Sequence, residues 1–180
     1  DPRSGLFPDE LMISRRLSRR RRSGRFEVTL DEAFGDVVRG CAAPRRDATG
    51  TWITGRMKRA YQRLHWAGFA HSCEVWQDGE LAGGIYGVSL GGMFFGESMF
   101  FREPDASKVA LASLIEHIAG WDFTLLDCQV MNPHLASLGA REIPRPEFLA
   151  LLTESLERPT HQGRWHFEGQ ALNEHAGRAG

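Results

Sequence analysis

Three polar residues interrupt two otherwise apolar segments of this 180-residue chain. Glu97 lies within MFFGESMFF, and Asp127 and Gln129 lie within TLLDCQV. Because residues two apart on a strand share a face, Asp127 and Gln129 are expected to point the same way. A carboxylate in an apolar strand costs stability unless it is paired, so these positions indicate either a functional site or a buried structural network.

A second concentration of chemistry is a run of arginines near the start of the chain. Residues 15–25 read RRLSRRRRSGR, and Leu11, Ile13 and Leu17 are spaced to anchor a short helix with arginines on its outer face. Guanidinium groups bind phosphate oxygens in pairs, so the run predicts a polyanion-binding surface. The alternative is a solvated face paired with acids, since the first 90 residues carry 15 Lys and Arg against 11 acids and the remainder carry 7 against 12.

Other familiar chemistries lack a complete motif. The seven histidines and three cysteines form no set of ligands at zinc spacing, so no metal is expected. There is no nucleophile elbow and no P-loop. The loop 102–108 lacks the glycines with which acetyl-coenzyme A enzymes hold pyrophosphate. The following helix could still receive a phosphate near Ser107 and Lys108, and the alternative is ordinary capping by Asp105.

The elements that must position these residues follow from hydrophobic spacing and turn signals. Strands are expected at 26–30, 72–77, 81–90, 93–101 and 124–130. Helices are expected at 31–41, with Asp31 as N-cap, and at 57–67, 106–118, 133–138 and 147–156. Asp78-Gly79 and Gly91-Gly92 are hairpin turns, which makes the central strands an antiparallel meander. The order predicts an α+β fold with a mixed sheet, which suits an acyltransferase in which neighbouring strands separate to admit substrate.

Composition and charge exclude several classes of protein. With 42% hydrophobic and 25% charged residues, the chain has globular composition, which excludes wholesale disorder. A net charge of -1 excludes a uniformly basic nucleic-acid binder, and no apolar run approaches the length of a membrane span. Three scattered cysteines indicate reduced thiols in a cytoplasm. We expect a basic lead-in at 1–25, one folded domain at 26–158 and a polar tail at 159–180.

Several short motifs occur together in a fixed order. They are GTWIT at 50–54, HSCEVW at 71–76, GGIYGV at 83–88, FGESMF at 95–100, DASK at 105–108, DCQ at 127–129, HL at 134–135, GA at 139–140 and IPR at 143–145. Over roughly Asp1 to Leu152, this order and spacing closely resemble the bacterial leucyl/phenylalanyl-tRNA–protein transferases. The family's small N-terminal domain precedes the Asp-Pro at which this chain begins, so we expect the chain to correspond to the family's catalytic domain.

The resemblance implies a fold, a reaction and its partners. The fold is GNAT-like, with a mixed sheet flanked by helices. The reaction moves Leu or Phe, and less readily Met, from aminoacyl-tRNA to the α-amino group of a protein that begins with Arg or Lys. The product is marked for degradation in the cytoplasm by the N-degron pathway. Charged tRNA is the acyl donor, so no metal or other cofactor is implied, and we expect a monomer without membrane contact.

The resemblance also implies roles for particular residues. Gln129 lies at the reacting centre and orients the attacking amine, and Asp127 holds the Gln129 amide. Glu97 binds either the ribose or the incoming cationic N-terminus. Trp52 and Tyr61 are implied as aromatic contacts to the aminoacyl end of the donor. Replacing Gln129 or Asp127 with Ala is therefore expected to lower kcat by on the order of 10²-fold or more.

An apolar pocket for the Leu or Phe side chain is implied at Ile85, Phe94, Leu114 and Leu126. Strand alternation instead puts the neighbour of Phe94 on the face of Glu97, and a β-bulge at Gly96 would remove this conflict. In the family context the arginine run and the helix start would bind tRNA phosphates, through Arg15, Arg16, Arg19, Arg20, Arg21, Arg22, Ser107 and Lys108.

Two alternatives from other classes stay open. One is an amine acetyltransferase that uses acetyl-coenzyme A, against which the missing glycines of the 102–108 loop argue. The other is a non-catalytic tRNA-binding module, which would bind charged and uncharged tRNA alike and turn over neither.

Overall fold

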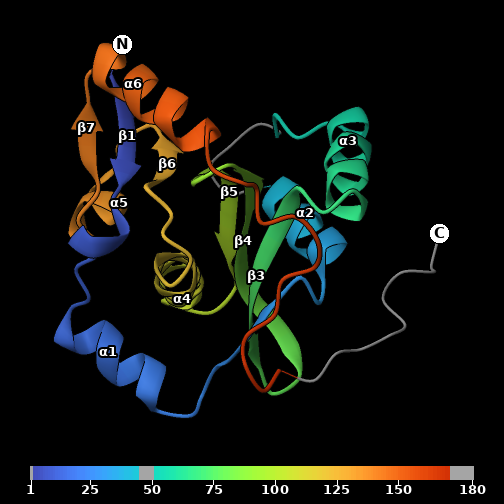
Figure 1. Ribbon diagram of the computed structural model, residues 1–180. Helices are drawn as coiled ribbons and strands as arrows, with labels where there is room; N and C mark the ends of the chain where they lie inside the picture. The colour runs from blue at the N-terminus through green and yellow to red at the C-terminus, as the bar shows by residue number, and fades with distance from the viewer. Residues whose placement is uncertain (1, 45–50, 171–180) are drawn as a thin grey trace.

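The computed structural model describes residues 2–44 and 51–170, which are arranged around one mixed sheet (Figure 1). The sheet has seven strands in the order β2-β3-β4-β5-β6-β1-β7. The strands are β1 (Arg3–Leu6), β2 (Glu27–Leu30), β3 (Ala70–Gln77), β4 (Glu80–Leu90), β5 (Met93–Phe101), β6 (Leu125–Gln129) and β7 (Arg141–Ile143). The helices are α1 (Arg15–Arg22), α2 (Phe34–Ala42), α3 (Gly55–Trp66), α4 (Ala106–Ala119), α5 (Pro133–Ser137) and α6 (Arg145–Leu156), with a short 3-10 helix η1 (Pro8–Glu10). The expected α+β architecture is confirmed.

Strands β3, β4 and β5 form the expected antiparallel meander. Asp78 and Gly79 have φ angles of 52° and 79°, and this pair of left-handed residues is what the tight hairpin turn requires. Helix α4 then crosses over to β6, which pairs parallel to β5. A crossover is needed because two parallel neighbours cannot be joined by a short hairpin.

Two successive glycines of β4 show which helices cover which face of the sheet. A side chain at Gly83 would meet Ala106 at the start of α4, whereas one at Gly84 would meet Val37 of α2. Because successive residues of a strand point to opposite faces, α4 and α2 lie on opposite sides of the sheet. Helix α3 packs beside α2, and α6 covers the same face over β5, β6 and β7 through Phe148 (Figure 1).

A β-bulge in β5 changes which side chains share a face. The register between β4 and β5 shifts between Tyr86 and Gly87, which leaves Glu97 as an extra residue on β5. The bulge expected at Gly96 is therefore present, centred on the next residue. The bulge shifts the alternation only from Ser98 onward. Phe94 faces the core under α4 and Glu97 faces α3, so the two side chains stay on opposite faces and the bulge does not remove the conflict over Phe94.

Strand β6 carries a second bulge, next to the first in space. The register between β1 and β6 shifts between Ser4 and Gly5, which leaves Cys128 as the extra residue. Burial and a nearby carboxylate raise the pKa of the Cys128 thiol to about 12, so it is not a nucleophile at neutral pH. Strands β5 and β6 pair only through 93–95 and 125–127, and beyond these residues they separate.

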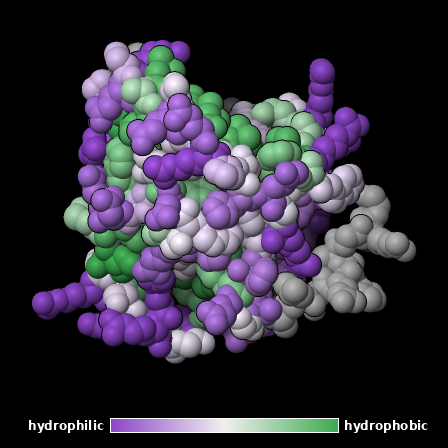
Figure 2. Space-filling view, in the orientation of Figure 1, coloured by the Kyte–Doolittle hydropathy of each residue, from purple (hydrophilic) through white to green (hydrophobic). Residues whose placement is uncertain are grey.

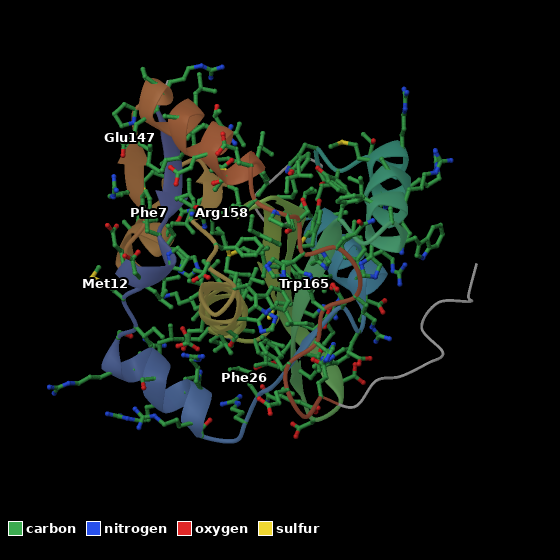
Figure 3. The ribbon with its side chains drawn as sticks, viewed as in Figure 1. Phe7, Met12, Phe26, Glu147, Arg158 and Trp165 are labelled. Carbon is green, nitrogen blue, oxygen red and sulfur yellow. The ribbon has the colours of Figure 1, made fainter. Side chains whose placement is uncertain are left out.

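Both ends of the described chain differ from expectation, because both belong to the folded domain. Segment 1–25 contributes β1, which pairs with β6 on one side and β7 on the other. Its four residues are too few for alternation to reveal a strand. The segment after 158 continues along the sheet to residue 170 and buries Trp165, 2% exposed, in the core under α4 (Figure 3).

A buried polar cluster fixes this C-terminal segment. The carboxylate of Asp31 accepts hydrogen bonds from the backbone N–H groups of Ser72 (2.9 Å) and Trp165 (2.7 Å) and lies 2.8 Å from His71 Nδ1. The indole of Trp165 stacks on the His71 ring, with centroids 3.7 Å apart. Asp31 itself has φ 54°, and α2 begins only at Phe34, so the expected N-cap is wrong because these partners occupy its carboxylate.

Glu74 belongs to the same cluster and is fully buried. Its carboxylate accepts hydrogen bonds from the hydroxyls of Thr29 (2.6 Å) and Ser72 and from the backbone N–H of Glu32 (3.3 Å). Burial raises the pKa of Glu74 to about 7, although the hydrogen bonds act in the opposite direction. The name buried cluster is used for Thr29, Asp31, His71, Ser72 and Glu74.

Candidate active site

Three residues expected at the reacting centre meet where β5 and β6 separate. The side-chain Nε2 of Gln129 donates to the carbonyl oxygen of Gly96 (3.1 Å) and to Glu97 Oε2 (3.5 Å). The backbone N–H of Gln129 donates to Asp127 Oδ1 (2.9 Å). These contacts bridge β6 and β5 just beyond their last paired residues. The two bulges therefore place side chains from separate strands against one another.

Gln129 is held in an uncommon backbone conformation. Its φ is 64°, in the left-handed region, which costs a non-glycine residue roughly 1 kcal/mol or more. The hydrogen bond from its N–H to Asp127 offsets this strain. With Nε2 directed at Gly96 and Glu97, the amide oxygen Oε1 accepts no hydrogen bond from the residues that the structure describes. That oxygen retains its capacity to accept a hydrogen bond.

The carboxylate of Asp127 is fully buried and has a partner that the sequence did not reveal. Arg3 of β1 donates from Nε to Oδ1 (3.3 Å) and from Nη2 to Oδ2. The expected contact between Asp127 and the Gln129 side-chain amide is replaced by a contact to the Gln129 backbone. The Arg3 guanidinium also lies 5.3 Å from the ring centroid of Phe148 on α6.

Arg3 has no local sequence signal, because it lies 124 positions from Asp127. The only signal is energetic: an ionised carboxylate buried in an apolar strand needs a cation beside it. The chain offers 22 Lys and Arg as candidates, and nothing local to Asp127 selects among them.

Tyr61 of α3 joins the site through its hydroxyl, which donates to Glu97 Oε2 (2.9 Å). Burial, followed by the hydrogen bond and the charge of Glu97, raises the pKa of Tyr61, so the hydroxyl stays a donor at neutral pH. Trp52, the other expected aromatic contact, is 53% exposed. The name opening cluster is used for Arg3, Tyr61, Glu97, Asp127 and Gln129.

The four residues expected to line the acyl pocket lie together in the core under α4. Ile85, Phe94, Leu114 and Leu126 are each at most 2% exposed. Two of them approach the opening cluster: a side chain built on Gly96 would lie 3.6 Å from Leu126 and 4.0 Å from Ile85. The apolar group therefore lies directly behind the carbonyl that anchors Gln129.

The arginine run forms α1, as expected, and packs beside α4. Ser14 caps the helix by accepting a hydrogen bond from the N–H of Leu17 (3.1 Å), and Leu17 is the buried anchor. Leu11 and Ile13 pack against the same core at partial exposure. Strongly hydrophilic residues gather in this part of the surface (Figure 2).

The arginines divide into two sets. Arg16 and Arg20 pair with Asp105 at 3.3 Å and 3.4 Å, and Arg21 pairs with Glu116. Pairing with the acidic second half of the chain, the alternative left open by the sequence, is thus present for this set. The other set, Arg15, Arg19 and Arg22, is exposed and has no acidic partner in the described part of the chain.

The start of α4 differs from expectation. Asp105 occupies the N-cap position but has φ 69° and makes no side-chain capping bond, because Arg16 and Arg20 bind its carboxylate. Ser107 is only 7% exposed, and Lys108 is half-buried. Of the expected phosphate contacts at this helix start, Lys108 is the more accessible.

Taken with this geometry, the fold defines a class of protein. A mixed sheet that opens between β5 and the parallel β6, with helices on both faces, is the arrangement of the GNAT-like fold. A GCN5-related N-acetyltransferase from Kribbella flavida superimposes with a TM-score of 0.50 and 11% identity, over 78% of this chain and 54% of that one. L-PGS from Bacillus licheniformis gives 0.51 and 11%, over 84% of this chain and 51% of that one. At this identity they show the fold alone.

Sequence similarity then gives the family. The family model described as leucyl/phenylalanyl-tRNA protein transferase matches residues 5–153. The leucyl/phenylalanyl-tRNA–protein transferase of Desulfatibacillum aliphaticivorans is 55% identical over 94% of this chain and 73% of its own length. That of Anaeromyxobacter sp. (strain Fw109-5) is 57% identical over 93% of this chain and 72% of its own length. The chain belongs to the leucyl/phenylalanyl-tRNA–protein transferase family.

Residues 2–44 and 51–170 lack two further kinds of feature. No helix in these ranges combines the length and the apolar character needed to cross a membrane. Nor do His, Cys, Asp and Glu side chains gather there in threes that could hold a metal ion.

Proposed function

We propose that the chain moves Leu or Phe from aminoacyl-tRNA to the α-amino group of proteins that begin with Arg or Lys. Membership of the transferase family supports the reaction. One observation supports the site: Gln129 presents an amide oxygen without a hydrogen-bond partner among the described residues where β5 and β6 separate, beside the carboxylate of Glu97. An acceptor oxygen next to a negative charge suits an incoming amine.

The chemistry asks for positioning more than for activation. An aminoacyl ester is already activated, and an α-amine with a pKa near 8 is partly neutral in a cytoplasm. Gln129 Oε1 would accept one N–H of the amine and aim its lone pair at the ester carbon. As the C–N bond forms and the C–O bond to the tRNA breaks, the nitrogen loses one proton and the ribose oxygen gains one.

Glu97 would counter the positive charge that develops on the attacking nitrogen. Its Oε2 is already fixed by Tyr61 at 2.9 Å and approached by Gln129 Nε2 at 3.5 Å, so the carboxylate is oriented before substrate arrives. Preoriented charge of this kind is the main way in which an active site lowers a barrier. The same carboxylate would also favour an N-terminal residue that carries a second positive charge.

The donor would be held at its two ends by different parts of the molecule. Its Leu or Phe side chain would enter the apolar group behind Gly96, which consists of Ile85, Phe94, Leu114 and Leu126. Because these residues are at most 2% exposed, they would have to move apart to admit it. Trp52 and Tyr61 would contact the aminoacyl end of the donor. Its phosphates would meet α1, where Arg19 contributes to a hollow of about 410 Å³ lined largely by arginines. Contacts to phosphates carry no base information, which suits an enzyme that accepts several tRNAs.

The proposal is tested by transfer of labelled Leu from charged tRNA to a peptide beginning with Arg, with the N-acetylated peptide as control. We expect label on the free peptide alone. Binding of charged and uncharged tRNA without transfer would instead support a binding module. Stabilisation by coenzyme A, with acetylation of the peptide, would support the acetyltransferase alternative.

A further inference from the structure

We propose that Arg3 is a positioning residue for the transfer reaction, acting through Asp127 to hold Gln129 in its working conformation. The inference rests on the proposed function, because it assigns Gln129 to the reacting centre. It concerns a residue at the start of β1 that no sequence motif singled out.

A continuous chain of contacts runs from Arg3 to the side chain of Gln129. Arg3 binds both oxygens of Asp127, and Asp127 Oδ1 accepts the backbone N–H of Gln129 at 2.9 Å. That N–H belongs to the residue with φ 64°. The same residue sends its side-chain amide to the Gly96 carbonyl at 3.1 Å. One guanidinium is thus connected, through two hydrogen-bonded steps, to the side chain at the opening.

Electrostatics explains why the first link has to be a cation. The Asp127 side chain has no exposed surface, and an unpaired carboxylate there would pay a large desolvation penalty. Without Arg3 the carboxylate would lose the partner that holds both of its oxygens, so Oδ1 would no longer be a fixed acceptor. The left-handed Gln129 would then lose the bond that offsets its strain. Its amide would be free to leave the opening.

Arg3 is itself held firmly enough to serve as an anchor. It pairs in register with Ile143 of β7, and its guanidinium lies 5.3 Å from the ring of Phe148. Its side chain is still 34% exposed, so one side of the guanidinium faces solvent. A small cation could therefore enter the space that a truncated side chain would leave.

The test compares Arg3→Ala and Arg3→Lys with a matched control, Arg141→Ala. Arg141 lies on the adjacent strand, pairs with Glu10 at 3.2 Å and stacks 4.3 Å above Phe7, but does not contact the opening cluster. We expect Arg3→Ala to lower kcat on the order of 10²-fold, the loss for a catalytic group displaced by about 1 Å. KM for peptide and tRNA should stay near wild type. The kcat of Arg3→Lys should lie between those of wild type and Arg3→Ala, because an ammonium group binds one carboxylate oxygen at a time.

Two measurements separate positioning from general stabilisation. Millimolar guanidinium should restore kcat to Arg3→Ala, whereas urea, which has the same shape but no charge, should not. In an Asp127→Asn background, Arg3→Ala should cause little further loss, because both changes break the same link. An unchanged kcat in Arg3→Ala, a loss confined to KM for tRNA, or equal effects of guanidinium and urea would each overturn the inference.

The inference also has a readout that does not depend on transfer. The side-chain amide signals of Gln129 in a nitrogen-15 spectrum of the full chain should shift or broaden in Arg3→Ala and stay unchanged in Arg141→Ala. Should the wild-type chain transfer nothing, the proposed function would fail while this spectrum still tested the link. Unperturbed Gln129 signals in Arg3→Ala would overturn it.

Discussion

The buried cluster and the opening cluster each contain one Asp and one Glu, yet they differ in how many of their hydrogen-bond acceptors are occupied. In the buried cluster, every carboxylate oxygen of Asp31 and Glu74 accepts a hydrogen bond or lies beside a ring nitrogen. In the opening cluster, Glu97 Oε1 and Gln129 Oε1 accept none from the described residues. Both of these side chains are partly exposed, whereas Asp31 and Glu74 are buried.

A carboxylate in an apolar strand is therefore not by itself evidence of an active site. Glu97 and Asp127 satisfy that pattern, and so does Glu74 of the buried cluster, which helps to hold β2 and β3 together. What distinguishes the opening cluster is unused acceptor capacity at a place where two strands separate. Within it, Asp127 resembles the buried cluster, since both of its oxygens are occupied.

The largest expected effect is on stability, from Asp31→Ala. The change leaves the N–H groups of Ser72 and Trp165 without their acceptor, and we expect a loss of about 3–5 kcal/mol in the free energy of unfolding. Urea denaturation measures it, with Asp36→Ala on the exposed side of α2 as a control expected within about 0.5 kcal/mol of wild type. The transfer rate per folded molecule should not change. If Asp31→Ala lowered the turnover of the folded protein, the buried cluster would have a catalytic role and the contrast with the opening cluster would be wrong.

Gln129→Ala should show the opposite pattern. We expect kcat to fall on the order of 10²-fold or more, because the amine loses its acceptor, with little change in Tm. Gln162→Ala is the matched control, since its amide donates to the carbonyl of Ala67 on an exposed surface. If Gln129→Ala turned over at the wild-type rate, Gln129 would not be part of the reacting centre.

Glu74 makes the buried cluster sensitive to pH. Its pKa is raised from 4.5 to about 7 in the folded state, so the folded protein holds a proton that the unfolded chain releases. This contribution to stability is complete below about pH 4.5 and is lost as the pH rises to about 7, with a total on the order of 3 kcal/mol. Unfolding of wild type and Glu74→Gln from pH 4 to 8 measures it. Parallel curves for the two proteins would contradict the assignment.

The smallest expected effect sharpens a second contrast, between the paired and unpaired arginines of α1. Replacing Arg15, Arg19 and Arg22 with Gln should weaken tRNA binding and reduce its log–log salt slope by roughly 0.7–0.9 for each phosphate that is no longer neutralised. The matched triple, Arg16, Arg20 and Arg21 to Gln, should change the slope less, because those groups already pair with acids at α4. Filter binding across a salt series compares them. If the salt slope changed more in the Arg16, Arg20 and Arg21 variant, the paired arginines would be the ones that bind phosphate.

Much of the fold could be predicted from the sequence, because local signals agree with the tertiary structure there. Asp78-Gly79 set the hairpin, and the long apolar helix at 106–119 crosses between two strands, as its composition indicates. Strands β1 and β7 could not be found this way. They are four and three residues long, and only their neighbours in the sheet make them strands.

The candidate site was predictable in its members more than in its connections. Glu97, Asp127 and Gln129 were singled out by type and spacing, whereas the conflict over Phe94 is not removed by the bulge, because Phe94 and Glu97 still face opposite sides of the sheet. Periodicity did not reveal the left-handed backbone of Gln129. Nor did it reveal the ion pair between Arg3 and Asp127 or the hydrogen bond from the Trp165 N–H to Asp31, which join residues far apart in sequence. Such pairings are fixed by packing of the whole domain, which periodicity along one segment cannot report.

The pairing of Arg3 with Asp127 also determines when the opening cluster can form during synthesis of the chain. Ribosomes add about 5–20 residues per second, so roughly 6–25 s pass between synthesis of these two partners, which lie 124 positions apart. Until β6 leaves the exit tunnel, β1 has neither of its neighbours, because β7 follows later still. A nascent chain therefore cannot complete the opening cluster before β6 has emerged. Competence for transfer should arise only after β6 has left the exit tunnel, when the central strands of the sheet have had time to form.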